Sequence, residues 1–590
     1  MSKNSTEQFI SFTSTHKKSA ASQVECFVCK LFVDSLHILW NSDITEECIA
    51  ELVTEICIFL KIVDHLICRM LIADLKDEVA YLIGQLILEP RQICGLLLNG
   101  CGGVPYNPLA QANWTIPISG NKPPVEEIVQ PKPGTTPTLR VLHLADIHID
   151  LKYKIGSEAL CGDPICCREN STEQNNKTVK YPAGKWATLG ACDLPMWTVE
   201  KTLSSLSKSK KFDMIYWTGD LASHANWEYT RKEHLWLLRN LTHMFLKYFP
   251  GIPVYWAVGN HEGVPINSFP PHYVPDRFSN AWLYDTLASL WSNWLPDKTI
   301  PEIKWRASYV VRPFPGFRII SINTQYGYKL NFWLLLNQTD PDGTLTWLTE
   351  QLLEAEKAGD KVHIIGHIPG NGGLSAFANN YYNIVNRFEN TIRGQFFGHT
   401  HFDSFKLYYE DADSSKRPTG LAYVCPSLTT YISQGTLQPA YRIYQLDGNY
   451  KNSTWTVLDH ETWYMDVNES NLVDSPQWKF EYSARKAYNL SSLLPKDWND
   501  LVARIAKDSE LVDIYRRYRF RLPSVGACDE KCKQRVLCDL KRATEENGKL
   551  CNESRLQQNE LDEITTKVWR IPVNFMNTPP LKLDHCPIKL

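Results

Sequence analysis

The chain has 590 residues, 43% of them hydrophobic and 22% charged, which is long enough for roughly three or four globular domains. Its formal net charge of −3 provides no basic field for nucleic acid, and no Lys/Arg block forms a membrane-binding patch. No uninterrupted apolar run approaches the roughly 18 residues that a transmembrane helix needs. These features exclude a nucleic-acid-binding protein and a membrane-spanning one.

Cysteines and glycosylation sequons indicate an oxidising compartment. Seventeen cysteines are a heavy load for a cytosolic enzyme. N-x-S/T sequons begin at Asn4, Asn113, Asn170, Asn176, Asn240, Asn337, Asn452, Asn468, Asn489 and Asn552. Residues 1–23 contain no apolar segment, so they show no signal peptide, and we expect a disordered leader there. We still predict a secreted or lumenal glycoprotein with disulfide bonds.

Residues 24–103 are expected to form a small, all-α, disulfide-stapled unit. Val24, Phe27, Val28, Leu31 and Phe32 follow the spacing of an apolar helical stripe. The same segment carries Cys26, Cys29, Cys57, Cys68, Cys94 and Cys101. A bundle of this size has too little core to be stable without staples. Residues 104–138 are rich in proline and lack periodicity, which is typical of a semi-rigid linker.

Residues 139–465 change to an α/β pattern. Short apolar runs end in polar clusters, as in "LRVLHLADIHID", "FDMIYWTGD", "IPVYWAVGNHEG", "FRIISINTQ", "KVHIIGHIPG" and "RGQFFGHTHFD". Buried strands that alternate with helical stretches such as "GTLTWLTEQLLEAEKAG" predict a layered α/β domain. Residues 466–590 are expected to be mostly helical, with a final cysteine group of Cys528, Cys532, Cys538 and Cys551.

Most of these strands end in side chains that can bind a metal. In chain order they are Asp146 and His148, Asp220, Asn260 with His261, His367, and His399 with His401. Open α/β sheets place their sites at the carboxyl ends of strands, so these residues are expected to meet. Together they are the signature of a dinuclear metallophosphoesterase, in which a carboxylate bridges two divalent ions about 3.5–4 Å apart.

The metallophosphoesterase resemblance implies a role for each residue. It gives the first metal Asp146, His148, Asp220 and His401, and the second Asp220, Asn260, His367 and His399, with Asp220 as the bridge. Nitrogen and oxygen ligands without thiolate fit two Zn²⁺ ions per chain, although manganese or iron is also compatible. A bridging hydroxide would attack phosphorus while the cations stabilise the phosphoryl oxygens.

Two further histidines, His224 and His261, are not ligands in this scheme. A lipid or sugar alkoxide leaves poorly unless it is protonated, so we assign both histidines to leaving-group protonation and phosphate stabilisation. The alternative is that either one only orients a ligand. Purple acid phosphatases have a similar motif, G-D-x-x-Y, but this chain has Ser223 at the tyrosine position, so a tyrosinate–iron site is not expected.

The order of segments and several motifs resemble the acid sphingomyelinase family. The stretches are "ADIHIDLKY", "GNHEGVPINSFPP", "NFWLLLNQTDP", "DKVHIIGHIPG", "FFGHTHFDSF" and "YRIYQLDGNY". The resemblance implies a saposin-like domain over residues 24–103, a central β-sandwich flanked by helices, and lysosomal or secreted localisation. It also implies zinc-dependent hydrolysis of sphingomyelin to ceramide and phosphocholine at acidic pH by a monomer at a bilayer surface. The alternatives are a phosphodiesterase acting on soluble nucleotide or phosphocholine diesters or on other phospholipids, and a lipid carrier with a degenerate esterase site.

The same resemblance implies substrate contacts and disulfides. Asn267 and Tyr431 match choline-side positions, whereas Leu330 stands where the family has an acidic residue, which leaves headgroup selection open. The implied disulfides are Cys26–Cys101, Cys29–Cys94, Cys57–Cys68, Cys161–Cys166, Cys167–Cys192, Cys528–Cys532 and Cys538–Cys551. Cys48, Cys425 and Cys586 are left over. A further family bridge is lost, because "TQYGYKLNFW" and "GNGGLSAF" both lack its cysteine.

Overall fold

The computed structural model describes residues 46–59, 65–85, 113–132, 134–169, 171, 178–432, 435–522 and 525–544. The chain divides into two compact units, Met1–Ala112 with Glu560–Leu590, and Asn113–Asn559. In the first unit, helices α2 (Glu46–Phe59) and α3 (His65–Gln85) are joined by the buried disulfide Cys57–Cys68. The predicted pairs Cys26–Cys101 and Cys29–Cys94 lie outside the described residues.

The second unit is built on two six-stranded mixed sheets. The first has the order β14-β13-β12-β1-β2-β3 and the second β4-β5-β6-β7-β9-β8. The first sheet contains β1 (Thr138–Leu144), β2 (Met214–Trp217), β3 (Val254–Trp256), β12 (Ala440–Asp447), β13 (Val457–Met465) and β14 (Trp478–Ser483). The second contains β4 (Tyr309–Phe314), β5 (Phe317–Ser321), β6 (Lys361–Ile365), β7 (Ile392–Phe397), β8 (Ser404–Tyr409) and β9 (Pro418–Val424). A short hairpin, β10 (Tyr431–Ile432) with β11 (Gly435–Thr436), completes the strands of this part.

The two sheets pack face to face, and their shared core explains the apolar strand sequences. The Tyr216 hydroxyl on β2 lies 2.9 Å from Nδ1 of His363 on β6. The Phe396 ring of β7 lies against Tyr216 and against Tyr444 of β12, with ring centroids 5.0 and 4.9 Å apart. Strands buried on both faces have no solvent side to alternate with, so they form continuous apolar runs.

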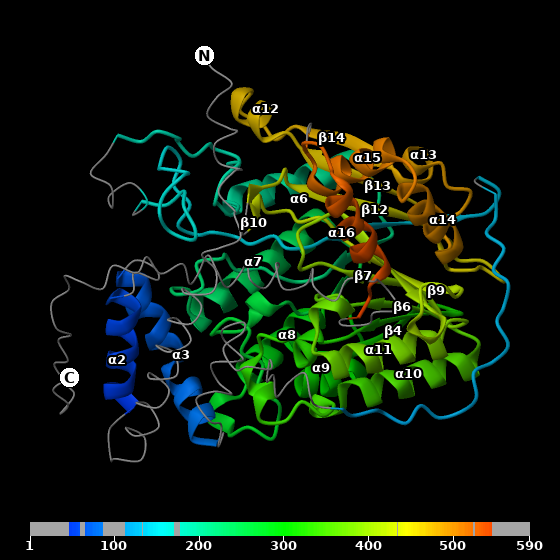
Figure 1. Ribbon diagram of the computed structural model, residues 1–590, viewed down its shortest axis with the longest axis horizontal. Coiled ribbons are helices and arrows are strands. Elements are labelled where there is room, and N and C mark those ends of the chain that lie inside the picture. Colours follow the sequence, from blue (N-terminus) through cyan, green and yellow to red (C-terminus); the bar gives the residue numbers. More distant parts are fainter. Residues whose placement is uncertain are drawn as a thin grey trace. The chain divides into compact units, whose positions relative to one another are not determined.

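Helices flank the sheets (Figure 1). The first group is α6 (Met196–Ser209), α7 (Arg231–Tyr248), α8 (Ala281–Trp291), α9 (Ile300–Arg306), α10 (Thr344–Ala358) and α11 (Ser375–Arg387). The later group is α12 (Val467–Leu472), α13 (Ala484–Tyr488), α14 (Pro495–Ile505), α15 (Ser509–Phe520) and α16 (Glu530–Lys541). The segment after residue 465 is therefore not wholly helical, because β14 pairs with β13 and extends the first sheet.

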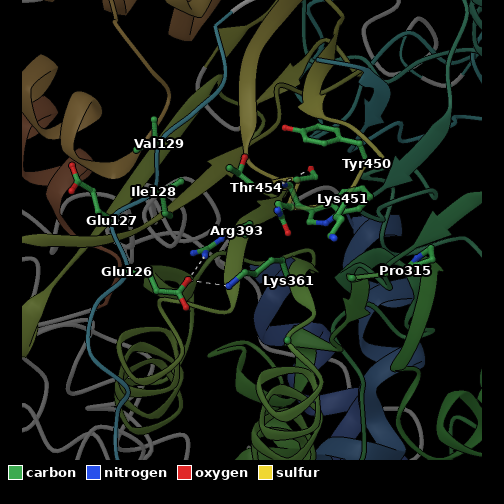
Figure 2. A pocket seen from close by; sticks show the side chains of 15 residues that line it. Glu126, Glu127, Ile128, Val129, Pro315, Lys361, Arg393, Tyr450, Lys451 and Thr454 are labelled. Carbon is green, nitrogen blue, oxygen red and sulfur yellow. Dashed lines mark hydrogen bonds and ion pairs between the residues drawn. The ribbon is translucent and has the colours of Figure 1, made fainter. Parts of the chain in front are cut away.

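Part of the proline-rich segment is docked on the second unit. The Ile116 amide donates to Asn380 Oδ1 at 2.9 Å, and the Glu126 amide donates to Asn390 Oδ1 at 3.0 Å. The Glu126 carboxylate lies 3.2 Å from Lys361 Nζ and 3.3 Å from an Arg393 guanidinium nitrogen (Figure 2). These side chains supply hydrogen-bond partners that an irregular backbone cannot provide for itself.

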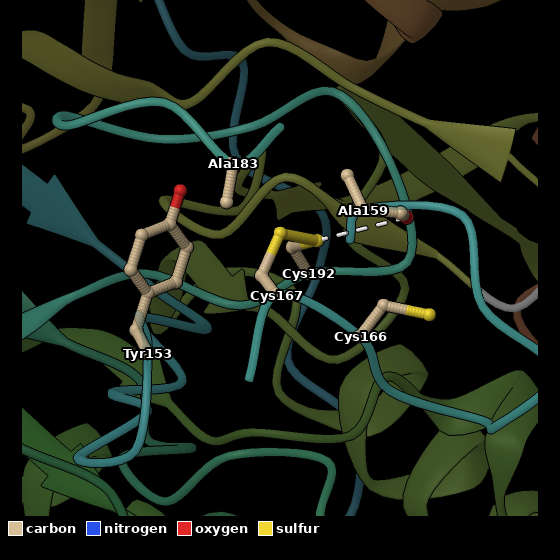
Figure 3. Packing of buried hydrophobic residues seen from close by; sticks show 6 residues of the cluster. All are labelled: Tyr153, Ala159, Cys166, Cys167, Ala183 and Cys192. Atoms are coloured by element: carbon tan, nitrogen blue, oxygen red, sulfur yellow. Dashed lines mark hydrogen bonds between the residues drawn. A yellow bond between two sulfur atoms is a disulfide. The ribbon is translucent and has the colours of Figure 1, made fainter. Parts of the chain in front are cut away.

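Two disulfides staple the long loop after β1. Cys161 pairs with Cys166, and Cys167 pairs with Cys192. Figure 3 shows the second bond among Tyr153, Ala159 and Ala183, which form a small buried cluster. Further along, Cys528 pairs with Cys532, and Cys538 is also disulfide-bonded, while its predicted partner Cys551 lies outside the described residues. Cys425 is a buried free thiol, and the side chain of Cys48 and all of Cys586 lie outside the description.

An ion-pair cluster fastens α16 to the second sheet. Asp539 of α16 contacts Lys406 of β8, and its other oxygen lies 2.7 Å from Arg519 of α15. Burial alone would raise the pKa of Asp539, but the two cations outweigh burial and hold the pKa below its ordinary value.

We expect Asp539→Asn to destabilise the protein by about 1–3 kcal/mol at pH 5 to 7, because a partly buried charged hydrogen bond is lost. The folded pKa is depressed, so this stabilisation is present above the unfolded pKa of about 3.9 and fades as pH falls towards the folded pKa. Chemical denaturation at several pH values should therefore show a variant penalty that is constant above about pH 5 and shrinks below about pH 4. A penalty that grows in acid would contradict this reasoning.

Candidate metal centre

The structure brings all the predicted metal-site residues together at the carboxyl ends of five strands. Asp146 and His148 follow β1, Asp220 follows β2, and Asn260 begins a 3-10 turn (Asn260–Glu262) after β3. His367 follows β6, and His399 and His401 follow β7. Three groups of side chains have ligand atoms within 4.8 Å of one another: Asp146, His148 and His401; Asp220, His367 and His399; and His148, His224 and His261.

The backbone of this cluster is held in an unusual conformation. Asp146, His148, Asp220, His399 and His401 all have φ between 45° and 70°. This left-handed region is costly for a residue with a side chain and persists only where the surroundings enforce it. The chain is also packed closely here, because a Cβ at Gly259 would lie 2.2 Å from Asp220 Oδ1 and 2.4 Å from the Asp220 backbone nitrogen. Such strain is concentrated at functional sites in proteins.

Backbone carbonyl groups fix the orientation of three imidazoles. His148 Nδ1 lies 2.8 Å from the carbonyl oxygen of Ala222, and His367 Nδ1 lies 2.6 Å from that of Thr218. His401 Nδ1 lies 2.7 Å from the carbonyl oxygen of Tyr431. A carbonyl only accepts, so in the neutral imidazole each Nδ1 carries the proton and each Nε2 keeps its lone pair. His148 Nε2 is buried without a hydrogen-bond partner. This is the arrangement that metal-binding histidines adopt.

Electron-rich oxygen and nitrogen atoms lie close together in the group formed by Asp220, His367 and His399. Asn260 Oδ1 lies 3.0 Å from His367 Nε2 and 3.0 Å from His399 Nδ1, and Asp220 Oδ2 lies 3.1 Å from His367 Nε2. Burial lowers the pKa of His367, but Asp220 and then Asp146 raise it, to about 9. The pocket therefore demands positive charge, which either a proton or a metal ion can supply.

Asp220 lies between the two groups. Its Oδ2 is 3.5 Å from His148 Nε2 as well as 3.1 Å from His367 Nε2, and the His261 amide donates to Oδ1 at 2.9 Å. The carboxylate is 2% exposed, so these contacts are almost wholly shielded from water. Oxygen and imidazole donors without sulfur suit zinc, manganese or iron, and the fit is to a divalent cation.

His224 and His261 lie beside His148 and are not part of the group formed by Asp220, His367 and His399. Their rings lie 4.0 and 4.6 Å from the His148 ring, measured between centroids. Burial lowers the pKa of His261 to about 4, which Asp220 only partly offsets. His224 Nδ1 lies 2.9 Å from Asp193 Oδ1, and the Thr429 hydroxyl donates to the same oxygen at 2.9 Å.

Two residues at the site were missed by the sequence reasoning. Asp193 is fully buried and orients His224, but it stands in "CDLP", which has no metal-site pattern. Glu262 accepts from the backbone amides of Asp220 and Leu221 at 3.1 and 2.8 Å and so braces the Asp220 turn. Its position directly after Asn260 and His261 in "GNHE" is the sequence signal that could have identified it. Burial, followed by Asp220, raises the pKa of Glu262 to about 7.

The predicted choline-side residues also lie at the cluster. Asn267 Oδ1 accepts from Asn260 Nδ2 at 3.1 Å, and the Tyr431 ring lies against His224 with ring centroids 4.2 Å apart and ring planes tilted by 37°. Leu330 is partly buried. The loops that lack the family disulfide still lie together, because Tyr328 pairs with Gly373 and the Leu374 amide donates to the Gly327 oxygen at 2.7 Å.

The C-terminal region reaches the His401 loop directly. Arg521, 2% exposed, donates to the carbonyl oxygens of His401 and Gln438 at 3.1 and 2.7 Å. The Asp403 amide, two residues after His401, donates to the Arg519 oxygen at 3.2 Å. Residues after α15 therefore help to hold a loop of the candidate site.

We expect Asp193→Asn to reduce turnover roughly 10- to 100-fold while metal content stays unchanged, because an orienting carboxylate is lost but no ligand is. Steady-state kinetics and metal analysis would check this. Unchanged turnover would contradict a role for this pair.

Comparisons with known proteins agree with this geometry. Residues 139–403 match the family model described as calcineurin-like phosphoesterase, and residues 418–553 match that of the acid sphingomyelin phosphodiesterase C-terminal region. The fold and site thus define a calcineurin-like metallophosphoesterase domain. Sphingomyelin phosphodiesterase 2 of Caenorhabditis elegans is 38% identical over 90% of this chain and 88% of its own length.

Sphingomyelin phosphodiesterase of Bos taurus is 39% identical over 89% of this chain and 83% of its own length. The chain belongs to the acid sphingomyelinase family of enzymes, which confirms the resemblance drawn from its motifs. Each helix in the described ranges is too short or too polar to span a bilayer.

Proposed function

We propose that this protein hydrolyses sphingomyelin to ceramide and phosphocholine at acidic pH. The observation that carries the proposal is the convergence of Asp220, Asn260, His367 and His399 on one buried, electron-rich point. The sphingomyelin phosphodiesterases to which the chain is similar over most of its length support the choice of substrate.

The metal-binding roles follow from the donor atoms. Asp146, His148, Asp220 and His401 would hold one divalent ion, and Asp220, Asn260, His367 and His399 the other. We propose zinc for both, because borderline imidazole nitrogen and carboxylate oxygen are its usual ligands outside thiolate sites. When bound, the two ions would supply an acidified water as nucleophile and positive charge for the phosphoryl oxygens.

The chain's own residues supply orientation and proton transfer. His261 and His224 stand beside His148 and provide imidazole groups for the departing ceramide oxygen and for a phosphoryl oxygen. Asp193 fixes the His224 ring so that Nε2 is free for this purpose. Asn267 and Tyr431 lie where the choline end would sit, and an aromatic ring attracts a quaternary ammonium.

The domain arrangement is part of the proposal. Residues 24–103 form a saposin-like domain that presents lipid, 104–138 a linker, 139–465 the catalytic domain and 466–590 a C-terminal region that is mostly helical apart from β14. The α2–α3 hairpin with Cys57–Cys68 supports the first assignment. The protein acts as a lysosomal or secreted, N-glycosylated monomer, in line with its disulfide bonds.

Removing residues 24–103 is expected to spare hydrolysis of a soluble phosphodiester but to reduce action on sphingomyelin liposomes about tenfold or more, since the bilayer surface would no longer be engaged. Parallel assays of the two substrates on the full chain and the shortened chain would measure the ratio. Equal loss on both substrates would instead indicate a folding defect, and no loss on liposomes would refute lipid presentation.

Product analysis by mass spectrometry at about pH 5 with zinc tests the reaction itself. Sphingomyelin liposomes, phosphatidylcholine liposomes and a soluble nucleotide diester are offered side by side. Ceramide and phosphocholine forming fastest is the expected result. Preference for the nucleotide diester would keep the metal centre but replace the substrate, and Leu330 in place of a carboxylate is the feature that would explain it.

A further inference from the structure

A second polar site lies at the far ends of β6 and β7 from the histidine cluster. A cleft of about 410 Å³ opens there, lined among others by Lys361, Arg393, Lys451 and Glu126 (Figure 2). We call it the Lys361–Arg393 cleft. Lys361 begins β6, whereas His367 follows its end. At about 3.3 Å per residue the separation is about 20 Å, so the cleft takes no direct part in chemistry at the cluster.

The cleft is lined by three cations, Lys361, Arg393 and Lys451, and by two carboxylates, Glu126 and Glu127. The Arg393 side chain is 4% exposed and that of Lys361 is 22% exposed. Among the described residues, the carboxylate that ion-pairs with both is Glu126, whose side chain is 57% exposed. Two nearby carboxylates form ion pairs with other arginines, Glu356 with Arg387 at 2.8 Å and Glu389 with Arg417 at 3.0 Å. They still act electrostatically on the cleft, because Glu356 raises the pKa of Lys361 and Glu389 that of Arg393.

The buried guanidinium also has unused hydrogen-bonding capacity. Arg393 Nε is buried without a hydrogen-bond partner, while its other nitrogens contact the Glu389 carbonyl oxygen at 3.2 Å and Glu126 at 3.3 Å. An unmade hydrogen bond on a buried charged group is costly, so an additional acceptor would be stabilised there. Burial lowers the pKa of both Lys361 and Arg393, and the Arg393 charge adds to the lowering at Lys361.

We propose that the Lys361–Arg393 cleft binds a small oxyanion, the phosphate or sulfate group of an inorganic ion or of a soluble phosphate monoester. A guanidinium beside an ammonium is well suited to such a group, because the guanidinium makes directional hydrogen bonds and the ammonium acts as a point charge. Glu126, which belongs to the docked proline-rich segment, occupies the same cations and competes with the anion.

Sulfate titration of thermal unfolding on the metal-loaded full chain tests this. The natural protein should show a saturable rise in Tm, above the linear rise that sulfate gives every protein by exclusion from its surface. Lys361→Gln should raise the sulfate concentration at the midpoint about tenfold or abolish the saturable rise. Glu126→Gln should lower that concentration several-fold, because a competing negative charge is gone. The matched control is Lys496→Gln, an exposed lysine paired with Asp500, which should leave the midpoint unchanged.

Further arms separate this site from the histidine cluster. Sulfate inhibition of turnover reports the cluster and should be the same in Lys361→Gln and the natural protein. Inorganic phosphate and glycerol 3-phosphate are compared to learn whether the phosphate group alone is recognised, and equal midpoints are expected.

Asn452 also lines the cleft and heads a sequon, so the titration is repeated in Asn452→Gln. The proposal would be overturned if the sulfate midpoint were the same in Lys361→Gln, Glu126→Gln and the natural protein. A saturable rise seen only in Asn452→Gln would overturn it as well.

Discussion

Asp220→Asn is expected to lower turnover by about 10³-fold or more and to reduce bound metal. The Asp220 carboxylate lies near imidazole nitrogens of both ligand groups, 3.5 Å from His148 Nε2 and 3.1 Å from His367 Nε2. Asparagine keeps the shape but removes the charge that would hold two cations together. Charge stabilisation by metal ions contributes several kcal/mol to such reactions, and each 1.36 kcal/mol is about tenfold in rate. Elemental analysis of the purified variant, alongside kcat, would measure both effects.

A matched control is available in Asp342→Asn. Asp342 is also a buried carboxylate on a histidine, 2.9 Å from His272 Nδ1, but it lies outside the three candidate ligand groups. This control should keep its metals and its turnover. Full metal content in Asp220→Asn would show that this carboxylate is not the bridge.

His261→Ala should cut turnover about 10²- to 10⁴-fold, the usual contribution of a positioned general acid. Both metals should remain, because the His261 contact to Asp220 is made by the backbone amide at 2.9 Å, which alanine retains. The imidazole itself is buried, and its Nδ1 has no hydrogen-bond partner, so removing the ring breaks no hydrogen bond of Nδ1. Turnover and metal content are measured on the same preparation as for Asp220→Asn.

The comparison of the two variants separates proton transfer from metal binding. His272→Ala, at an exposed histidine, is the matched control and should behave like the natural protein. A chromogenic ester with a good leaving group should rescue His261→Ala more than Asp220→Asn, because such a group needs no proton. Equal metal loss in both variants would undo this division of roles.

The residues of the candidate metal centre could be predicted to meet because each follows an apolar strand and parallel strands deliver their carboxyl ends to one edge. That reasoning needs only local pattern and strand order, as for Asp146, Asp220 and His367. Asp193 and Arg521 could not be predicted in this way. Each reaches the site through a tertiary contact, from a disulfide-stapled loop and from the end of α15, and neither sits in a motif.

Fold features were missed for a similar reason. β14 is only partly buried, so its sequence lacks the apolar run that marked the other strands. The docking of the proline-rich segment depends on Asn380, Asn390 and Lys361, which lie more than two hundred residues away in sequence. Composition predicted that this segment lacks helices and strands, but composition carries no information about the partner surface.

The clamp of Arg521 on the His401 carbonyl bears on how sequence variants in this protein are interpreted. A substitution near residue 520 lies about 120 positions from the nearest candidate ligand along the chain, yet one hydrogen bond separates them in space. Substitutions there are expected to lower activity although every candidate ligand is intact. The part of the chain that activity requires therefore extends through α15. A gene fragment ending at residue 465 would encode an incomplete enzyme.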